Sequence, residues 1–188
     1  MVTPPDPAGL LELGLAVFAL PPGDRRPGPG WHDATITDAQ QLAERWRPGD
    51  NIGVPCRPNR LVVLDLDRKN GVDGVAALAA AAAKAGGGIP HTLVVATPNG
   101  GRHLYYRLPP GRIIGSTSAG TSGLGPGIDT RGPGRRFGGY VVGPDSLVDD
   151  RRYTIADAAP IAQLPAWIAD ILAARTAAAL RVKVRQAS

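Results

Sequence analysis

The chain has 188 residues, of which 43% are hydrophobic, so it is long enough and apolar enough to bury the core of one domain. Its net charge of +5 favours an anionic partner such as a nucleotide or a nucleic acid. The single cysteine, Cys56, excludes an internal disulfide and a zinc site built from cysteines.

The N-terminal region lacks the pattern of an export signal. No basic segment precedes an apolar core, and the apolar run 10–20 is interrupted by Glu12 and Gly14. We therefore expect no signal peptide and no membrane span, and by default a cytoplasmic protein.

Apolar periodicity and capping residues predict helices and strands that alternate in the first part of the chain, after which hairpins dominate. The expected helices are 6–14, a helix capped by Thr37 or Asp38 that runs through Trp46, 72–85, and one from near Pro165 through Leu180. The expected strands are 15–20, 51–56, 61–66, 92–97, 102–108, 127–132 and 138–144, with a flexible loop at 115–127. This order predicts a mixed α/β (α+β) fold, an α/β half followed by an antiparallel half around one site.

The stretch LVVLDLDRKN, at 61–70, ends an apolar strand with two carboxylates. Because side chains alternate across a strand, Asp65 and Asp67 are expected on one face, about 6–7 Å apart. Two carboxylates partly withdrawn from water repel each other, and a divalent cation removes that conflict. The pair predicts a metal site that handles a phosphorylated substrate. Solvated residues at a strand end are the simpler alternative, and a calcium loop is excluded because Lys69 and Ala76 occupy two of its ligand positions.

Two further stretches carry candidate chemistry. In TPNGGRHLYY, His103 follows a glycine turn and could donate to a phosphate oxygen, although a tolerated polar residue at a strand start is the alternative. In GPGIDTRG, Asp129 and Arg131 share one face of a strand. A metal ligand beside a guanidinium suits a triphosphate carried on a metal, while an ordinary ion pair along one strand remains open.

Taken together and in this order, these motifs closely resemble the bifunctional primase-polymerase (prim-pol) domains of the archaeo-eukaryotic primase superfamily. The motifs are Asp-x-Asp after an apolar strand, Gly-Gly-x-His before a Tyr-rich strand, and Gly-x-Asp-x-Arg-Gly before Gly-Tyr-Val-Val. Such domains occur in replication proteins of plasmids, phages and integrated elements. The resemblance covers roughly residues 9–172 and extends to LGLAVFALPPGDRRPGPGW and LPAWIADIL.

The resemblance implies a fold and a domain organisation. The expected fold is an archaeo-eukaryotic primase catalytic core, with an N-terminal α/β unit, an RRM-like antiparallel unit and the active cleft between them. Residues 1–188 are expected to form one catalytic domain, with 173–188 as a C-terminal helix or tail that leads toward further domains of a longer protein. The expected partners are further helical or helicase domains or a replicative helicase, and the protein is expected to be a monomer.

The resemblance also implies the roles of site residues. Asp65, Asp67 and Asp129 are implied to hold two divalent ions, Mg²⁺ or Mn²⁺. His103 is implied to be catalytic and to contact the phosphates of the incoming nucleotide, and Arg131 is a further implied phosphate ligand. No zinc is expected, because one cysteine and three histidines cannot build the zinc-binding stem of some relatives.

Four further residues complete the predicted site. They are Arg102 and Tyr105 for the nucleotide, and Arg135 and Arg136 for nucleic acid. The loop that carries Arg25 and Arg26 is left out of the site, because relatives usually carry a lysine before the proline of this loop. Phe137, Tyr105 and Tyr106 are candidates for stacking on bases, although Tyr106 is expected to face the core. For Arg135 and Arg136, solvated loop residues are the alternative.

The expected activity is that of a DNA primase-polymerase, a nucleotidyltransferase. It would transfer a nucleotide from an NTP or dNTP to a primer 3′-hydroxyl or an initiating nucleotide, directed by a single-stranded DNA template, by a two-metal mechanism. One alternative is a non-catalytic module of a replication initiator that binds single-stranded DNA or nucleotides. Another is a sugar-nucleotide transferase that uses the acidic pair with Mn²⁺.

Overall fold

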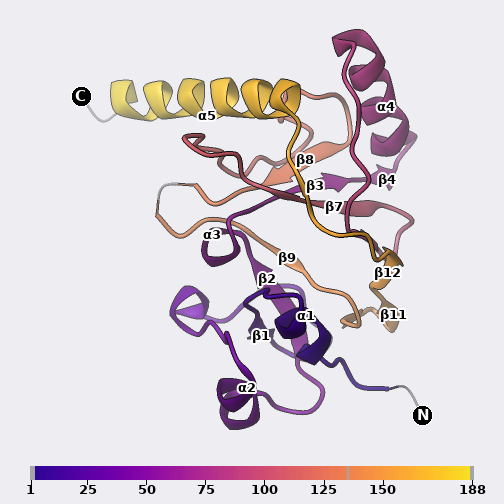
Figure 1. Cartoon of the computed structure of the whole chain (residues 1–188), viewed down its shortest axis with the longest axis vertical. Coiled ribbons are helices and arrows are strands. Elements are labelled where there is room, and N and C mark those ends of the chain that lie inside the picture. Colours follow the sequence, from indigo (N-terminus) through magenta and orange to yellow (C-terminus); the bar gives the residue numbers. More distant parts are fainter. Residues whose placement is uncertain (1–2, 135, 187–188) are drawn as a thin grey trace.

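Apart from the one-turn helix at Cys56–Asn59, the helices lie toward the ends of the molecule, and most of the strands lie between them (Figure 1). The structure is a computed structural model and describes residues 3–134 and 136–186. Helices α4 (Gly74–Ala85) and α5 (Ala166–Gln186) lie at one end, and α1 (Ala8–Glu12) and α2 (Ala39–Arg45) at the other (Figure 1). Across the described residues, no helix is long and apolar enough to cross a membrane.

The larger sheet carries the predicted acidic strand in its interior. Its strand order is β12-β6-β7-β3-β8, and β13 lies beside the end of β7. The bounds are β3 (Leu61–Leu66), β6 (Val94–Ala96), β7 (Arg102–Arg107), β8 (Ile128–Arg131), β12 (Thr154–Asp157) and β13 (Ala162–Gln163). All neighbouring pairs are antiparallel except β13 with β7.

A second, smaller sheet and two short hairpins complete the strands. The smaller sheet has the antiparallel order β1-β2-β9, with bounds β1 (Phe18–Leu20), β2 (Asn51–Pro55) and β9 (Tyr140–Val142). The hairpins are β4 (Arg68–Lys69) with β5 (Val72–Asp73), and β10 (Leu147–Val148) with β11 (Arg151–Arg152). The one-turn helix α3 (Cys56–Asn59) connects β2 to β3, and the 3-10 turn η1 (Trp31–Asp33) follows the loop after β1.

Strand β3 separates two apolar cores. Its odd-numbered residues Leu61 and Val63 pack with side chains of the smaller sheet. Its even-numbered residues Val62, Leu64 and Leu66 pack with side chains of α4 and α5. Because alternation sends successive side chains to opposite faces, one strand contributes to both cores. Asp65 is the next residue after Leu61 and Val63 on the odd-numbered face, and it lies just outside the core that those two residues join.

The mixed α/β fold expected from the sequence is confirmed, with antiparallel sheets and few helices. The structure refines one boundary in the site region, because α4 begins at Gly74 instead of residue 72. Residues 68–73 form the β4–β5 hairpin, whose turn residues Asn70 and Gly71 have φ of 53° and 77°. Asn-Gly is the dipeptide that such a turn favours. Asp73 ends the hairpin and caps α4, accepting hydrogen bonds from the N–H groups of Val75 and Ala76.

Candidate active site

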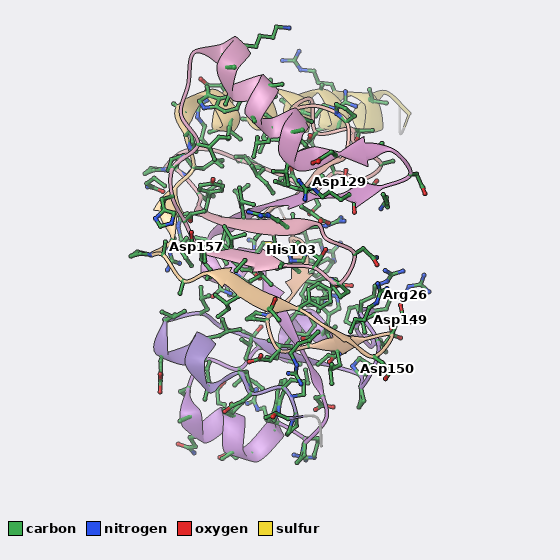
Figure 2. All side chains as sticks on the ribbon, turned by 90° about the vertical axis from the view of Figure 1, so that its right-hand side faces the viewer. Arg26, His103, Asp129, Asp149, Asp150 and Asp157 are labelled. Carbon is green, nitrogen blue, oxygen red and sulfur yellow. The ribbon has the colours of Figure 1, made fainter. Side chains whose placement is uncertain are left out.

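Three predicted site residues lie side by side across three neighbouring strands. In the register of the larger sheet, Asp65 on β3 is opposite His103 on β7 and opposite Asp129 on β8. Directly opposed side chains on one face of a sheet have Cβ atoms about 4.5–5.5 Å apart. The sheet therefore gathers a row, His103–Asp65–Asp129, from positions far apart in the sequence. Figure 2 shows His103 and Asp129 in the middle of the molecule.

Asp65, at the centre of the row, faces two donors. Its Oδ1 lies 3.5 Å from His103 Nε2, and its Oδ2 lies 3.5 Å from Nη2 of Arg131. Burial of the Asp65 carboxyl favours its neutral form, but His103 and Arg131 outweigh that effect and hold the pKa of Asp65 below its ordinary value. Asp65 is therefore a carboxylate at neutral pH, with both oxygens directed at cationic or donor groups.

Asp129 is buried beneath the glycine-rich loop 115–127. Its Oδ1 accepts a hydrogen bond of 2.8 Å from the N–H of Gly120. The neighbouring Arg131 donates from Nη1 to the carbonyl oxygen of Thr117 at 3.1 Å. The loop that the sequence marks as flexible is thus bonded to two predicted site residues and fixes their side chains.

Asp67 follows the end of β3, and its backbone is bonded on both sides. Its N–H donates to the carbonyl oxygen of Gly127 at 2.8 Å, and its carbonyl oxygen accepts from the N–H of Gly74 at 2.8 Å. Its carboxylate pairs with Lys69 Nζ at 2.8 Å, and this contact raises the pKa of Lys69. A Cβ added to Gly74 would lie 2.4 Å from the Gly127 oxygen, so only glycine fits at this junction.

His103 is almost completely buried, with 6% of its surface exposed. Its ring lies 5.8 Å from the ring of Tyr153, measured between centroids. Within the described part of the chain its Nδ1 has no hydrogen-bond partner. The imidazole is therefore held by packing on one side and by Asp65 on the other.

A cavity of about 590 Å³ lies over this row, and its lining includes Asp65, Asp67, Asp129, His103 and Arg131. This volume falls within the range of about 300–1,000 Å³ that is usual for small-molecule sites. Residues of both sheets contribute to the wall, since Tyr140 and Val142 of β9 also line it. The basic side chains of the lining are Arg25, Arg26, Arg68, Lys69, Arg131 and Arg151. Carboxylates at the floor and cations around them suit a polyanion that arrives with a bound metal.

A family model for the N-terminal domain of bifunctional DNA primase/polymerases, Prim-Pol, matches residues 8–167. The chain belongs to this family. The resemblance found in the sequence motifs is thereby confirmed, and the match spans both sheets and every strand. Prim-Pol membership implies a nucleotidyltransferase-type enzyme with primase/polymerase activity and with DNA and nucleotides as substrates. The comparison with curated proteins finds no match.

Sequence reasoning missed part of the Prim-Pol cavity, the basic loop after β1. Arg25 and Arg26 both line the cavity, and Figure 2 shows Arg26 on the same side of the molecule as Asp149. The loop is ordered by its own residues, because the Asp24 carboxylate accepts from the N–H groups of Arg25 and Arg26 at 2.6 and 3.0 Å. Tyr140 further donates its hydroxyl to the Arg25 carbonyl oxygen at 3.0 Å. The two consecutive arginines, Arg25 and Arg26, were the sequence feature that could have indicated this part of the cavity.

The structure corrects two of the expected nucleotide contacts. Tyr105 is fully buried in the core beside the smaller sheet, so it has no exposed ring face for a nucleotide. Arg102 is exposed, but it precedes His103 on β7 and so points to the opposite face of the sheet, away from the cavity lining. Of the two arginines expected to bind nucleic acid, Arg136 is exposed beside Phe137, and Arg135 lies outside the described residues.

The carboxylates of the Prim-Pol site fit a divalent cation by their chemistry. Asp65, Asp67 and Asp129 supply the oxygen ligands that Mg²⁺ and Mn²⁺ prefer, and all three line one cavity. As they are arranged, residues 3–134 and 136–186 contain no group of three or more His, Cys, Asp or Glu side chains close enough to hold a metal ion. Asp67 is paired with Lys69 and Asp65 with Arg131, so these basic groups compete with a cation for the carboxylate oxygens.

Proposed function

We propose that the chain is a DNA primase-polymerase. It would transfer a nucleotidyl group from an NTP or dNTP to a primer 3′-hydroxyl or an initiating nucleotide, directed by a single-stranded DNA template. The observation that carries this proposal is the row His103–Asp65–Asp129, which lies across three strands at the floor of a cavity with a basic rim. No protein nucleophile is needed, and burial raises the pKa of the only thiol, Cys56, to about 12.

In this proposal the acidic residues form the ligand set and the basic residues bind phosphate. Asp65, Asp67 and Asp129 would hold two Mg²⁺ or Mn²⁺ ions, which supply a lowered pKa for the attacking hydroxyl and charge neutralisation on the triphosphate. His103 and Arg131 now face the carboxylate of Asp65. Both donors line the same cavity and would donate to phosphate oxygens there, stabilising the charge that builds during transfer.

The remaining parts of the proposal concern the whole protein. We propose that residues 1–188 act as one catalytic domain, with the active cleft between an N-terminal α/β unit and an RRM-like antiparallel unit. The lining of the cavity by residues of both sheets supports this arrangement. We further propose that the protein works in the cytoplasm as a monomer, with helical or helicase domains or a replicative helicase as partners, in the replication of a plasmid, phage or integrated element.

The test is nucleotide incorporation on single-stranded DNA, with and without an annealed primer and with Mg²⁺ or Mn²⁺. The variant Asp129→Asn keeps the shape of the side chain and an oxygen for the Gly120 N–H, but removes the charge. The matched control is Asp149→Asn, since Asp149 lines the same cavity outside the row and its φ of 51° is one that asparagine tolerates.

We expect metal-dependent synthesis by the wild type and by Asp149→Asn, and background synthesis by Asp129→Asn. Products formed without a primer would add primase activity in this chain itself. If the wild type makes no product with either metal, and DNA binding is the same in Asp129→Asn, the catalytic proposal is wrong. A non-catalytic module that binds single-stranded DNA or nucleotides would then be the better description.

A further inference from the structure

A second groove, of about 390 Å³, lies next to the catalytic cavity and has a different lining. Three of its residues carry flat aromatic rings, Trp31, His32 and Phe137. Two more, Arg57 and Arg136, carry exposed guanidinium groups. We call this surface the aromatic groove; its full lining is Trp31, His32, Asp33, Thr35, Pro55, Arg57, Pro58, Arg136 and Phe137.

The flat groups of the aromatic groove are in contact with one another, with the rings of His32 and Phe137 tilted by 43°. The rings of His32 and Phe137 are 4.2 Å apart between centroids, and the Arg136 guanidinium lies 4.7 Å from the centroid of Phe137. Phe137 is nevertheless 45% exposed, which is unusual for so large an apolar ring. Exposed aromatic rings beside arginine are the surfaces on which the bases of a single strand stack.

The charge of the aromatic groove favours a polyanion. The lining contains two arginines, Arg57 and Arg136, and one acidic residue, Asp33, whose carboxylate lies 3.4 Å from His32 Nε2. Two guanidinium groups at the edge of a stacking surface match the alternation of bases and phosphates along a nucleic-acid strand. An apolar peptide would leave both guanidinium groups without partners.

The aromatic groove adjoins the catalytic cavity, and the two share one wall residue, Trp31. Trp31 lines both, and its ring is fixed from behind by Phe18 at 4.7 Å and by Tyr140 at 5.0 Å between centroids. Phe18 is fully buried, so Trp31 is anchored in the core and divides the two spaces. A strand that leaves the catalytic cavity past Trp31 therefore meets the rings of His32 and Phe137 next.

We propose that the aromatic groove binds one unpaired base of the single-stranded DNA template, stacked on Phe137, next to the base being copied. This inference rests on the proposed function, because the template is the strand that must lead out of the catalytic cavity. The incoming base takes the face of Phe137 that the Arg136 guanidinium now covers. Arg136 then moves to the adjoining phosphate, where Arg57 supplies a second contact.

The test measures binding of fluorescently labelled oligo-dT by anisotropy, without metal or nucleotide, beside an abasic oligonucleotide of the same length. The two probes carry the same phosphates and differ only in their bases. The variants are Phe137→Leu, which keeps apolar volume but removes the ring, and Phe137→Trp, which keeps a stacking surface. Because Phe137 is partly exposed, neither change opens a cavity in the core.

We expect the wild type to prefer oligo-dT over the abasic probe by about 5- to 150-fold, the effect of one base–aromatic stack. Phe137→Leu should lose that preference, and Phe137→Trp should keep it. Arg57→Ala and Arg136→Ala should weaken both probes alike and lower the salt slope by about one each. Lys84→Ala, which removes a positive charge from the far end of α4, is the control and should change neither quantity.

The inference is wrong if the wild type binds both probes equally, or if Phe137→Leu weakens both by the same factor. Primer extension by the wild type, measured in parallel, separates this failure from failure of the proposed function. Base-dependent binding without primer extension would support the inference about the aromatic groove and contradict the proposed polymerase function. Primer extension without base-dependent binding at Phe137 would support the proposed polymerase function and contradict the inference about the aromatic groove.

Discussion

Tyr105→Phe should stabilise the protein, although it removes a polar group from the centre of β7. The side chain of Tyr105 is fully buried, and within the described residues its hydroxyl has no hydrogen-bond partner. Burial also raises the pKa of Tyr105 well above its ordinary value, so the hydroxyl stays protonated and lacks an acceptor. An unsatisfied buried hydroxyl costs about 1–3 kcal/mol. Its removal gives back most of that cost, less a small loss of packing.

We therefore expect Tyr105→Phe to raise the free energy of unfolding by about 1 kcal/mol, which is about 2–4 °C in Tm for a chain of this size. The next residue gives a matched control. Tyr106 is equally buried, but its hydroxyl donates to the carbonyl oxygen of Pro90 at 3.4 Å. Tyr106→Phe loses this long bond and should lower the free energy of unfolding by about 0.5 kcal/mol.

The assay is thermal unfolding of both variants beside the wild type, together with primer extension. Equal destabilisation by the two changes would refute the reasoning, since it would show that the Tyr105 hydroxyl has a partner such as a buried water. A loss of nucleotide incorporation in Tyr105→Phe, with stability unchanged, would indicate that Tyr105 does contribute to the nucleotide site.

Two further predictions concern the segment after Asp67. Asp73→Ala should lower Tm at neutral pH. The ion pair with Arg68 and the N–H groups at the start of α4 lower the pKa of Asp73 in the folded protein. The contribution of Asp73 to stability is therefore present above its ordinary pKa of 3.8 and is lost as the pH falls through the lowered pKa. Melting curves from pH 7 down to about pH 3 should therefore converge, and a gap that persists at the lowest pH would count against this account. Gly74→Ala should cost about 1–2 kcal/mol, because crowding against the Gly127 oxygen outweighs the better helix propensity of alanine. It should also displace Asp67 and slow primer extension, whereas wild-type melting and wild-type extension would show that the junction has room.

The sequence could predict the elements of the site because each motif is local. Alternation along LVVLDLD places Asp65 on a definite face, and the glycine turn before His103 places that residue at the start of a strand. The sequence could not predict that Asp65, His103 and Asp129 share one row. That row depends on the register of three strands, which long-range packing sets.

The errors have physical causes as well. Alternation correctly puts Tyr105 on the same face as His103, but it does not tell where along the strand that face passes from the cavity into the core. The contact of Arg25 with the cavity depends on the Tyr140 hydroxyl, which lies 115 residues away in the sequence. No local pattern reports such a contact.

Strand β3 also constrains how sequences of this family can vary. Its odd-numbered and even-numbered positions have different neighbours, the smaller sheet for Leu61 and Val63, and helices α4 and α5 for Val62 and Leu64. Substitutions on the strand should therefore co-vary with two separate groups of positions in alternation along its six residues. A chimera of two relatives that exchanges β3 alone would bring in side chains fitted to two foreign cores at once.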